Sequence, residues 1–409
     1  MKFSWLLTVR GTGALALAAV IFVVIQEFEV PELRYFCVLL FVLVALSLAS
    51  LFLLRRSGRV TRVFSPDVST VGQPTRVQVR LRQGASLPTS GKTWEDELSD
   101  GLAGTASGPV PARDSEGDID LQYSFTPMSR GVRTVGPIRL TATDPFGIAR
   151  RKPTVGEVAT ITVAPAIVDF APLTESAGEA GGNLNSATHQ LGQGADNLAP
   201  RAYLPGDSMR RIHWRASARR DELMVRQEEQ ETTPDAIVVL DLGVDRWHAT
   251  AATRPGVDPA FETAVSACVS AVARLSREGY DVTVLDGEGV ALTDRIETGD
   301  NVAVEAFAVA CATVTARRHG LVNLPKAFAG THTGPLVLVT GSLSDADAQI
   351  IAPIAHRSTY PVLLLVGAPP ASLALVTAGG WRVGVARKAD ELSRAWAQAT
   401  DRGTAHVTG

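Results

Sequence analysis

The stretch of residues 203–229, "YLPGDSMRRIHWRASARRDELMVRQEE", combines six arginines with one tryptophan and one histidine. Guanidinium groups bind carboxylates and phosphates through paired N–H donors. If residues 208–220 are helical, Arg211, Arg215 and Arg219 recur every four residues along one face. The segment therefore has the chemistry to hold an acidic protein, a phospholipid head group or a nucleic-acid backbone.

Acidic side chains in the same segment support a competing interpretation. Asp207, Asp221, Glu222 and Glu228 are close enough in sequence to neutralise the arginines internally. We favour this internal network, which would lock two domains together and leave an outer face for another protein to contact. Docking of a protein, a lipid or a nucleic acid stays as an alternative.

The same residues predict the local structure. Pro205 and Gly206 suit the central positions of a type II turn, because proline fixes the first φ and glycine accepts a positive second φ. Asp207 then stands where a helix N-cap is expected. After the helix, the alternation in "ELMVRQEE" predicts a strand that leads into the next domain.

A nucleophilic set can be drawn in this segment from Ser208 or Ser217 with His213 and Asp207. Three common residue types in one polar stretch are weak support for it. The chain contains no H-E-x-x-H, no G-x-S-x-G and no G-x-G-x-x-G after a strand. We therefore expect no catalytic residues, and a hydrolase centred on Asp207 and His213 remains an alternative.

Residues 86–93, "SLPTSGKT", end like a phosphate-binding loop, but Ser86 replaces the first glycine and no apolar helix follows. The charge of −3 excludes a globally basic chain, so we expect no nucleic-acid partner. The three cysteines are far apart in sequence, which favours a reducing compartment.

Two apolar segments near the N-terminus, residues 5–25 and 35–54, predict two membrane helices. No small-residue cleavage site follows the first segment, so we expect no cleaved signal peptide. Their flanks predict the orientation. The cations Lys2, Arg10, Arg55, Arg56, Arg59 and Arg62 lie outside the pair, and Glu27, Glu29 and Glu32 lie in the connecting loop. By the positive-inside rule, both termini and the soluble domains are cytoplasmic, at the plasma membrane.

Two kinds of domain follow. Residues 75–82, 119–125, 138–142 and 159–163 alternate apolar with polar side chains, which predicts an antiparallel β-sandwich. The Gly/Ala/Ser-rich residues 171–200 are typical of a linker. Further on, short continuous apolar runs alternate with helical patterns over residues 259–277, 302–318, 345–356 and 390–399, which predicts a doubly wound α/β domain.

The arginine-rich segment resembles the domain of unknown function 58 family. The matching residues are Arg201, Tyr203, Gly206, Asp207, Arg210, Ile212, Trp214, Ala218, Arg219, Leu223 and Val225. Residues 130–151, "RGVRTVGPIRLTATDPFGIARR", resemble the second hallmark of that family, with Arg130-Gly131 and Asp144-Pro145-Phe146-Gly147. The resemblance spans nearly the whole chain. It implies a von Willebrand factor A-like domain at the C-terminus and a MoxR-type AAA+ ATPase as partner.

The same resemblance implies where a metal would bind. Metal-binding von Willebrand A domains carry Asp-x-Ser-x-Ser after their first strand, and its oxygens bind Mg²⁺. Here the sequence reads Asp241-Leu242-Gly243-Val244-Asp245, in which Gly243 removes one hydroxyl ligand. We expect no cofactor and keep Asp241 and Asp245 as weak Mg²⁺ candidates.

Together these patterns predict five parts. They are a two-helix anchor (1–56), a β-sandwich (57–170), a linker (171–200), the Arg/Trp segment (201–234) and a von Willebrand A-like α/β domain (235–409). We expect a membrane-anchored cytosolic scaffold or adaptor without enzymatic activity. The alternative to it, besides the hydrolase, is a module that binds anionic lipids through residues 55–62 and the arginine row.

Overall fold

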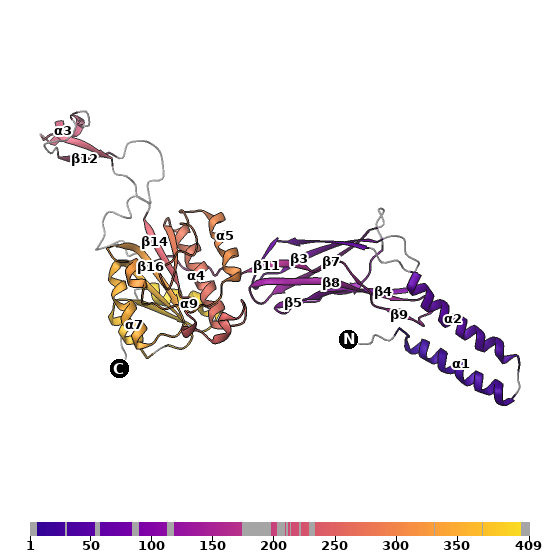
Figure 1. The fold of residues 1–409 in the computed structure, drawn as a ribbon. Helices are drawn as coiled ribbons and strands as arrows, with labels where there is room; N and C mark the ends of the chain where they lie inside the picture. Colours follow the sequence, from indigo (N-terminus) through magenta and orange to yellow (C-terminus); the bar gives the residue numbers. More distant parts are fainter. Residues whose placement is uncertain are drawn as a thin grey trace. The chain divides into compact units, whose positions relative to one another are not determined.

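The structure is a computed structural model, shown in Figure 1. It describes residues 6–28, 31–53, 58–83, 90–112, 118–173, 198–202, 209, 212, 214–220, 222–228, 234–330, 332–369 and 371–401. The chain divides into two compact units. The first consists of Met1–Ile167, Leu242–Val269 and Glu305–Arg318, and the second of Val168–Asp241, Ser270–Val304 and His319–Gly409.

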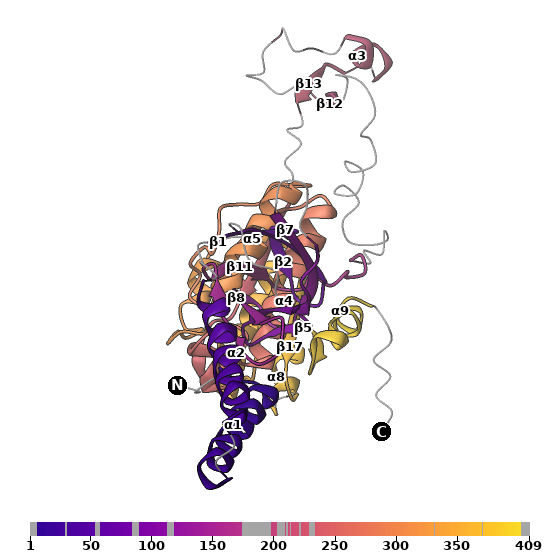
Figure 2. The ribbon, with the colours of Figure 1, turned by 90° about the vertical axis from the view of Figure 1, so that its right-hand side faces the viewer.

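Two apolar helices begin the chain, α1 (Val9–Phe28) and α2 (Leu33–Leu53). Both are long and apolar enough to cross a membrane. Twenty residues at about 1.5 Å each cover the hydrocarbon core of a bilayer. The helices lie side by side (Figure 2), and the thiol of Cys37 on α2 donates to the carbonyl of Ala18 on α1. The two expected apolar helices are therefore present.

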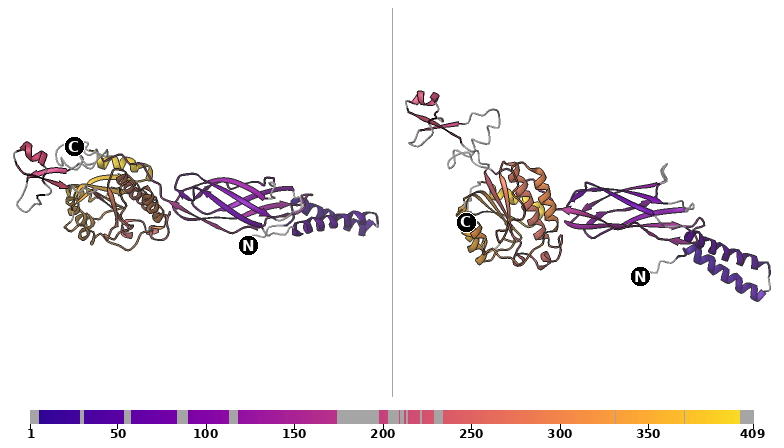
Figure 3. Two further views of the ribbon diagram at one scale, coloured as in Figure 1. Left: turned by 90° about the horizontal axis from the view of Figure 1, so that it is seen from above. Right: turned by 45° about the horizontal axis from the view of Figure 1, so that its top comes forward.

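Two largely antiparallel sheets follow in the first unit (Figure 3). The four-stranded sheet has the order β1 (Gly58–Ser65), β3 (Thr75–Gln83), β7 (Asp118–Pro127), β5 (Leu102–Gly104). The other has the order β2 (Val68–Thr70), β11 (Ala159–Ala164), β8 (Gly131–Thr143), β4 (Ser90–Leu98), β6 (Ser107–Pro109), and β9 (Arg150–Arg151) and β10 (Thr154–Val155) pair with β8. The four strands expected from alternation fall within β3, β7, β8 and β11.

One apolar core serves both sheets. Val79 and Leu121 of the four-stranded sheet belong to the same buried cluster as Trp94, Ile138 and Ile161 of the other. Alternate side chains along each strand point to this core, as the period of two requires. Residues 90–93 of the loop that ends like a phosphate-binding motif lie in β4, a strand, so the helix that such a motif needs does not follow them.

The C-terminal half contains a five-stranded parallel sheet. Its order is β15 (Asp281–Asp286), β14 (Asp235–Leu240), β16 (Thr333–Thr340), β17 (Ser358–Val366), β18 (Arg382–Ala386). The helices between these strands are α4 (Pro259–Arg277), α5 (Asn301–Ala310), α6 (Leu324–Ala327), α7 (Asp345–Ile351) and α8 (Leu373–Ala378), and α9 (Leu392–Thr400) follows the last strand. The near-continuous apolar runs become parallel strands because both faces of the sheet are buried.

Helices cover this sheet with apolar side chains. Ile351 of α7 and Val376 of α8 share a buried cluster with Val239, Leu338 and Leu363 of the strands. On α9, which contacts β17 and β18, Trp396 stacks on Phe170 with ring centroids 4.6 Å apart. The segment just after the antiparallel sheets is thereby fixed within the second unit.

Two local expectations were wrong. The helix expected over residues 302–318 ends at Ala310, because Arg317 pairs with a neighbouring segment: its N–H donates to Leu242 and its carbonyl accepts from Val244. The edge strand β18, "RVGVA", was not foreseen because a short run with a charge and a glycine carries little periodic signal.

Candidate functional site

The Arg/Trp segment is built on a small hairpin. Strand β12 (Leu198–Ala202) pairs antiparallel with β13 (Met224–Glu228), so that Arg201 lies opposite Val225. The expected helix is present from Trp214 onward as α3 (Trp214–Arg220). The Ser217 hydroxyl accepts a hydrogen bond from the Met224 N–H at 2.9 Å, which holds α3 against the start of β13. The segment thus forms its own two-stranded sheet, separate from the five-stranded one.

The described side chains of this segment divide into two groups. Ile212 and Met224 are buried, whereas Trp214 is 69% exposed and Arg219 is also exposed. Exposed tryptophan and arginine side chains are the residue types that most often anchor protein interfaces. The hairpin therefore presents Trp214 and Arg219 outward.

Several predicted site residues lie outside the described residues: Tyr203, Gly206, Asp207, Arg210, Arg211 and His213. Arg201 and Arg215 are placed on β12 and α3 by their backbone alone. Both the internal network of carboxylates and the hydrolase on Asp207 and His213 stay predictions.

Arg130, the first residue of the second hallmark, is only 1% exposed. Its Nε lies 2.8 Å from a carboxylate oxygen of Glu262 on α4, and its Nη1 donates to the carbonyl of Cys311. Its guanidinium also lies 5.5 Å from the centroid of the Phe261 ring. Gly131 follows with φ +123°, a conformation that favours glycine. Arg130 thus fixes the turn before β8 to α4 within the first unit.

A second arginine supports this turn. Arg133 donates to the Ser129 hydroxyl at 2.8 Å and to the Arg130 carbonyl at 2.7 Å. Burial, and then the nearby cation of Arg254, lower the pKa of Arg133. Arg133 therefore braces the turn through hydroxyl and backbone oxygens.

The other half of the hallmark is a closed loop at the start of α1. Asp144 is fully buried, and its carboxylate accepts hydrogen bonds from the N–H groups of Phe146 (3.0 Å) and Ala149 (2.6 Å). Gly147 supplies a φ of +72°. The Thr8 hydroxyl donates to Gly147, and the Thr8 N–H donates to Ile148 at 2.9 Å. The loop is therefore attached to the residues that begin α1.

The carboxyl ends of three parallel strands gather polar side chains. The sheet order reverses direction between β14 and β16, and ligands of such sheets bind at this switch point. Asp241 directly follows β14, and its carboxylate accepts a hydrogen bond of 2.6 Å from the hydroxyl of Thr340 at the end of β16. Both residues are fully buried.

Asp286, at the end of the neighbouring β15, was missed in the sequence. Its carboxylate accepts from the N–H groups of Glu288 and Val290, both at 2.9 Å, and lies 3.6 Å from Nδ1 of His319. Its position could have been inferred, because carboxyl ends of adjacent parallel strands meet at one edge. Asp286 organises the turn after its strand.

The second metal candidate, Asp245, is exposed in the short 3-10 turn Val244–Arg246. Among the residues that the structure describes, no group of three or more His, Cys, Asp and Glu side chains is arranged to hold a metal ion. The Asp241 carboxylate accepts a hydrogen bond from the Thr340 hydroxyl, and the Asp286 carboxylate accepts from two backbone N–H groups.

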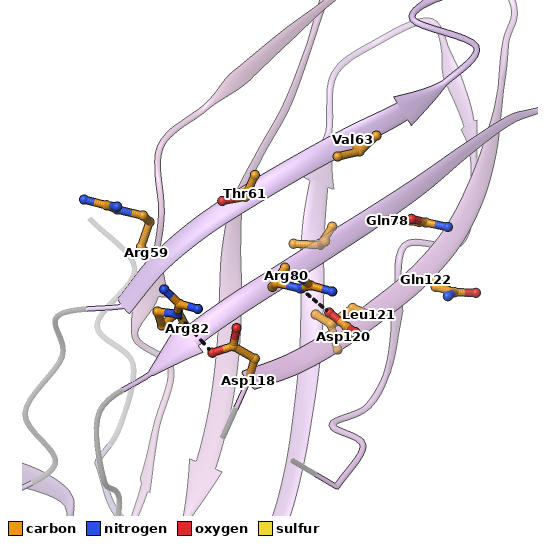
Figure 4. A pocket seen from close by; sticks show the side chains of 11 residues that line it. Arg59, Thr61, Val63, Gln78, Arg80, Arg82, Asp118, Asp120, Leu121 and Gln122 are labelled. Atoms are coloured by element: carbon orange, nitrogen blue, oxygen red, sulfur yellow. Dashed lines mark hydrogen bonds and ion pairs between the residues drawn. The ribbon is translucent and has the colours of Figure 1, made fainter. Parts of the chain in front are cut away.

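A groove of about 450 Å³ runs over the face of β1, β3 and β7 (Figure 4). Four of the five charged side chains that line it are paired across the strands, Arg80 with Asp120 at 3.1 Å and Arg82 with Asp118 at 3.3 Å, and the fifth is Arg59. Cross-strand pairs of this kind stabilise a sheet weakly and leave little net charge for a ligand. The groove is therefore lined mainly by cross-strand ion pairs.

Arg62 was wrongly included among the cations of residues 55–62 that the alternative assigns to lipid binding. Its side chain is buried, and it donates to both carboxylate oxygens of Asp96, at 3.2 and 3.1 Å. Arg62 thus belongs to the core of the sheets and is not available to head groups.

Comparison with known proteins is limited to part of the chain. Residues 199–293 match the family described as "Protein of unknown function DUF58". The match covers the Arg/Trp segment and the strands and helix from β14 to β15, and it supports the expected family there. No curated protein matches the chain.

Three similar solved structures each cover about a quarter of the chain. A CARDB domain from Pyrococcus furiosus is 13% identical, over 26% of this chain and 84% of that one, with a TM-score of 0.18. A cohesin module of a family 33 glycoside hydrolase from Clostridium perfringens is 13% identical, over 27% and 98%, with a TM-score of 0.17. A conjugative transposon lipoprotein from Bacteroides eggerthii is 11% identical, over 24% and 95%, with a TM-score of 0.16. Such low scores support no statement about fold or function.

Proposed function

We propose that this protein is a membrane-anchored scaffold or adaptor that presents its soluble units to a protein partner in the cytoplasm. One observation carries the proposal. Two apolar helices precede sheet domains, and in those domains the polar side chains at the carboxyl edge are bonded to one another and to backbone. The polar side chains at the carboxyl edge of the parallel sheet are engaged in internal hydrogen bonds, so the chain is suited to binding a partner and not to catalysing a reaction.

We place the soluble units on the cytoplasmic side of the plasma membrane. The support is the distribution of charge around α1 and α2. Arg10 at the start of α1, and Arg55, Arg56 and Arg59 after α2, lie on one side, and the short loop between the helices is acidic. Arg62 no longer contributes, since Asp96 neutralises it.

The finer architecture belongs to the same proposal. We assign the two antiparallel sheets to a β-sandwich, because one apolar core draws side chains from both. We assign the parallel sheet to a doubly wound, von Willebrand factor A-like domain. Its support is the strand order, in which β14 lies between β15 and β16, together with the match of residues 199–293 to the DUF58 family.

The partner we propose is a MoxR-type AAA+ ATPase, and the docking residues are Trp214 and Arg219. Tryptophan and arginine dominate the binding energy of many interfaces, because each buries a large surface and forms directed contacts. Both side chains are exposed on α3. No other described side chain covers most of the Trp214 ring.

Co-purification tests this proposal. The full chain in mild detergent should retain a MoxR-type ATPase from the same cell, and a variant with Trp214→Ala and Arg219→Gln should retain at least tenfold less, as expected for the loss of an interface anchor. The matched control is Val302→Ala with Arg394→Gln, which changes an exposed apolar residue and an exposed arginine elsewhere. Equal recovery with both double variants would reject this docking site, and the absence of any ATPase would reject the partner.

A further inference from the structure

The loop Asp144–Ala149 contains one side chain that its own architecture does not explain. Asp144 closes the loop, Gly147 supplies the positive φ, and Ile148 and Ala149 are buried. Phe146 is different, because its N–H is used and its ring is 58% exposed. A single exposed aromatic ring is common on protein surfaces, so the surroundings of this ring decide whether it has a partner surface.

Backbone hydrogen bonds fix the position of this loop relative to the start of α1. The N–H of Thr8 donates to Ile148 at 2.9 Å, and the N–H of Arg150 donates to Leu6 at 2.8 Å. The contact is close enough that a Cβ at Gly11 would lie 2.2 Å from the Ile148 oxygen. Because α1 begins at Val9, the loop lies level with the first turn of a membrane-length helix.

The exposed charged side chains of the loop and of the helix turn beside it are cationic. The guanidinium of Arg10 lies beside Gly147, 3.3 Å from the position that a Cβ would occupy there. Arg150 and Lys152 are exposed, whereas the carboxylate of Asp144 is buried under backbone N–H groups. An exposed aromatic ring within a set of cations is the composition that binds the interface of an anionic bilayer.

We infer that the Asp144–Lys152 loop is a membrane-interface contact. Phe146 enters the head-group region beside α1, and Arg10, Arg150 and Lys152 bind anionic phospholipid head groups. The inference rests on the proposed membrane anchoring, and it adds a surface that ties the soluble unit to the bilayer. This contact would limit how far the sheets can tilt away from the membrane.

A fluorescent probe tests the depth of the loop. Phe146→Cys, labelled with an environment-sensitive dye on the full chain in liposomes, should give blue-shifted emission that lipids with spin-labelled acyl chains quench. The native cysteines are buried and do not compete for the label. The matched control is Val132→Cys, since Val132 is 54% exposed. It lies on β8, the strand that leads into the loop, and about 35 Å of extended chain separates it from the loop.

Lipid composition tests the charges. Adding phosphatidylglycerol to phosphatidylcholine should increase the blue shift at position 146, and Arg150→Gln with Lys152→Gln should abolish that increase. Emission at position 146 equal to that at 132, or a shift that spin-labelled lipids do not quench, would overturn the inference. Resistance to alkaline carbonate extraction is measured on the same liposomes: loss of the chain there contradicts the anchoring itself, whereas retention with an unshifted probe contradicts only the loop contact.

Discussion

Arg62 and Asp96 form a two-bonded ion pair, with N–O distances of 3.2 and 3.1 Å, in the interior of the antiparallel sheets. Strand β1 carries Arg62 and strand β4 carries Asp96, so the pair joins the two sheets. The hydroxyl of Tyr123 on β7 donates to the same carboxylate at 2.7 Å. A cation that comes soon after the two apolar helices in the sequence is thus a core residue.

Removing the acid of this pair should destabilise the sheets strongly. Asp96→Asn leaves the buried Arg62 guanidinium without a counter-charge, for which we expect a loss of about 3 to 5 kcal/mol. Hydrogen exchange of β1, β4 and β7, measured by mass spectrometry on the full chain in detergent, reports this loss locally. The control Asp120→Asn breaks the exposed pair with Arg80 and should cost under about 1 kcal/mol. Equal protection in both variants would refute the role assigned to the pair.

Tyr123 should make the stability of the sheets depend on pH at the alkaline end. Burial and the neighbouring Asp96 raise the pKa of Tyr123 far above its ordinary value. The folded state therefore holds the phenolic proton more tightly than the unfolded state, so this contribution is complete below about pH 10 and is lost as the pH rises above it.

The comparison that isolates this effect is Tyr123→Phe. At neutral pH the variant should be less stable by about 1 kcal/mol, because the hydrogen bond to Asp96 is lost. Above about pH 10 the difference from the wild type should shrink. Thermal unfolding midpoints recorded from neutral to alkaline pH measure it, and a constant difference across that range would contradict the prediction.

Arg130 should protect a thiol. Burial raises the pKa of Cys311 to about 12, which leaves almost no reactive thiolate at neutral pH. Arg130→Ala removes the donor to the Cys311 carbonyl and the partner of Glu262, which exposes the thiol to solvent. The Arg130 cation itself lowers the pKa of Cys311, but the loss of burial outweighs this effect, so we expect Cys311 to react with a maleimide at least tenfold faster. Peptide mass spectrometry identifies the modified residue. The fully buried Cys268 is the internal control, and a parallel rise at both thiols would indicate general unfolding instead.

The contact between α1 and the loop should depend on a single glycine. In Gly11→Ala the new Cβ meets the Ile148 oxygen, so either the helix or the loop must shift. We expect faster hydrogen exchange over residues 144–150. Gly13→Ala is a matched control two residues along the same helix, where a Cβ would meet nothing within 4 Å. The same exchange rates in both variants would disprove the close approach.

Titration with Mg²⁺ tests the carboxyl edge of the parallel sheet. Because the Asp241 carboxylate already accepts from Thr340, we expect calorimetry of the full chain in detergent to give no saturable heat. A saturable signal that Asp241→Asn removes would show that this edge retains an ion site.

The sequence by itself determined the elements whose residue pattern is local. The two apolar runs, the alternating strands and the continuous strands of the parallel sheet are all present, since helix length and strand periodicity follow from side-chain polarity alone. Asp241, by contrast, was singled out by the resemblance to von Willebrand A domains, and it directly follows β14 (Asp235–Leu240).

Tertiary structure decided which charges are available, and polarity along the chain does not carry that information. In the sequence, Arg62 is one more cation after the second apolar segment. In the structure, Asp96 from another strand neutralises it. In the sequence, Arg130 belongs to a turn. In the structure, it forms an ion pair with Glu262 of α4. Likewise, residues 314–318 leave their helical pattern because Leu242 and Val244 offer backbone partners that a helix would not use. Long-range pairing of this kind depends on which segments meet, and only the folded chain brings them together.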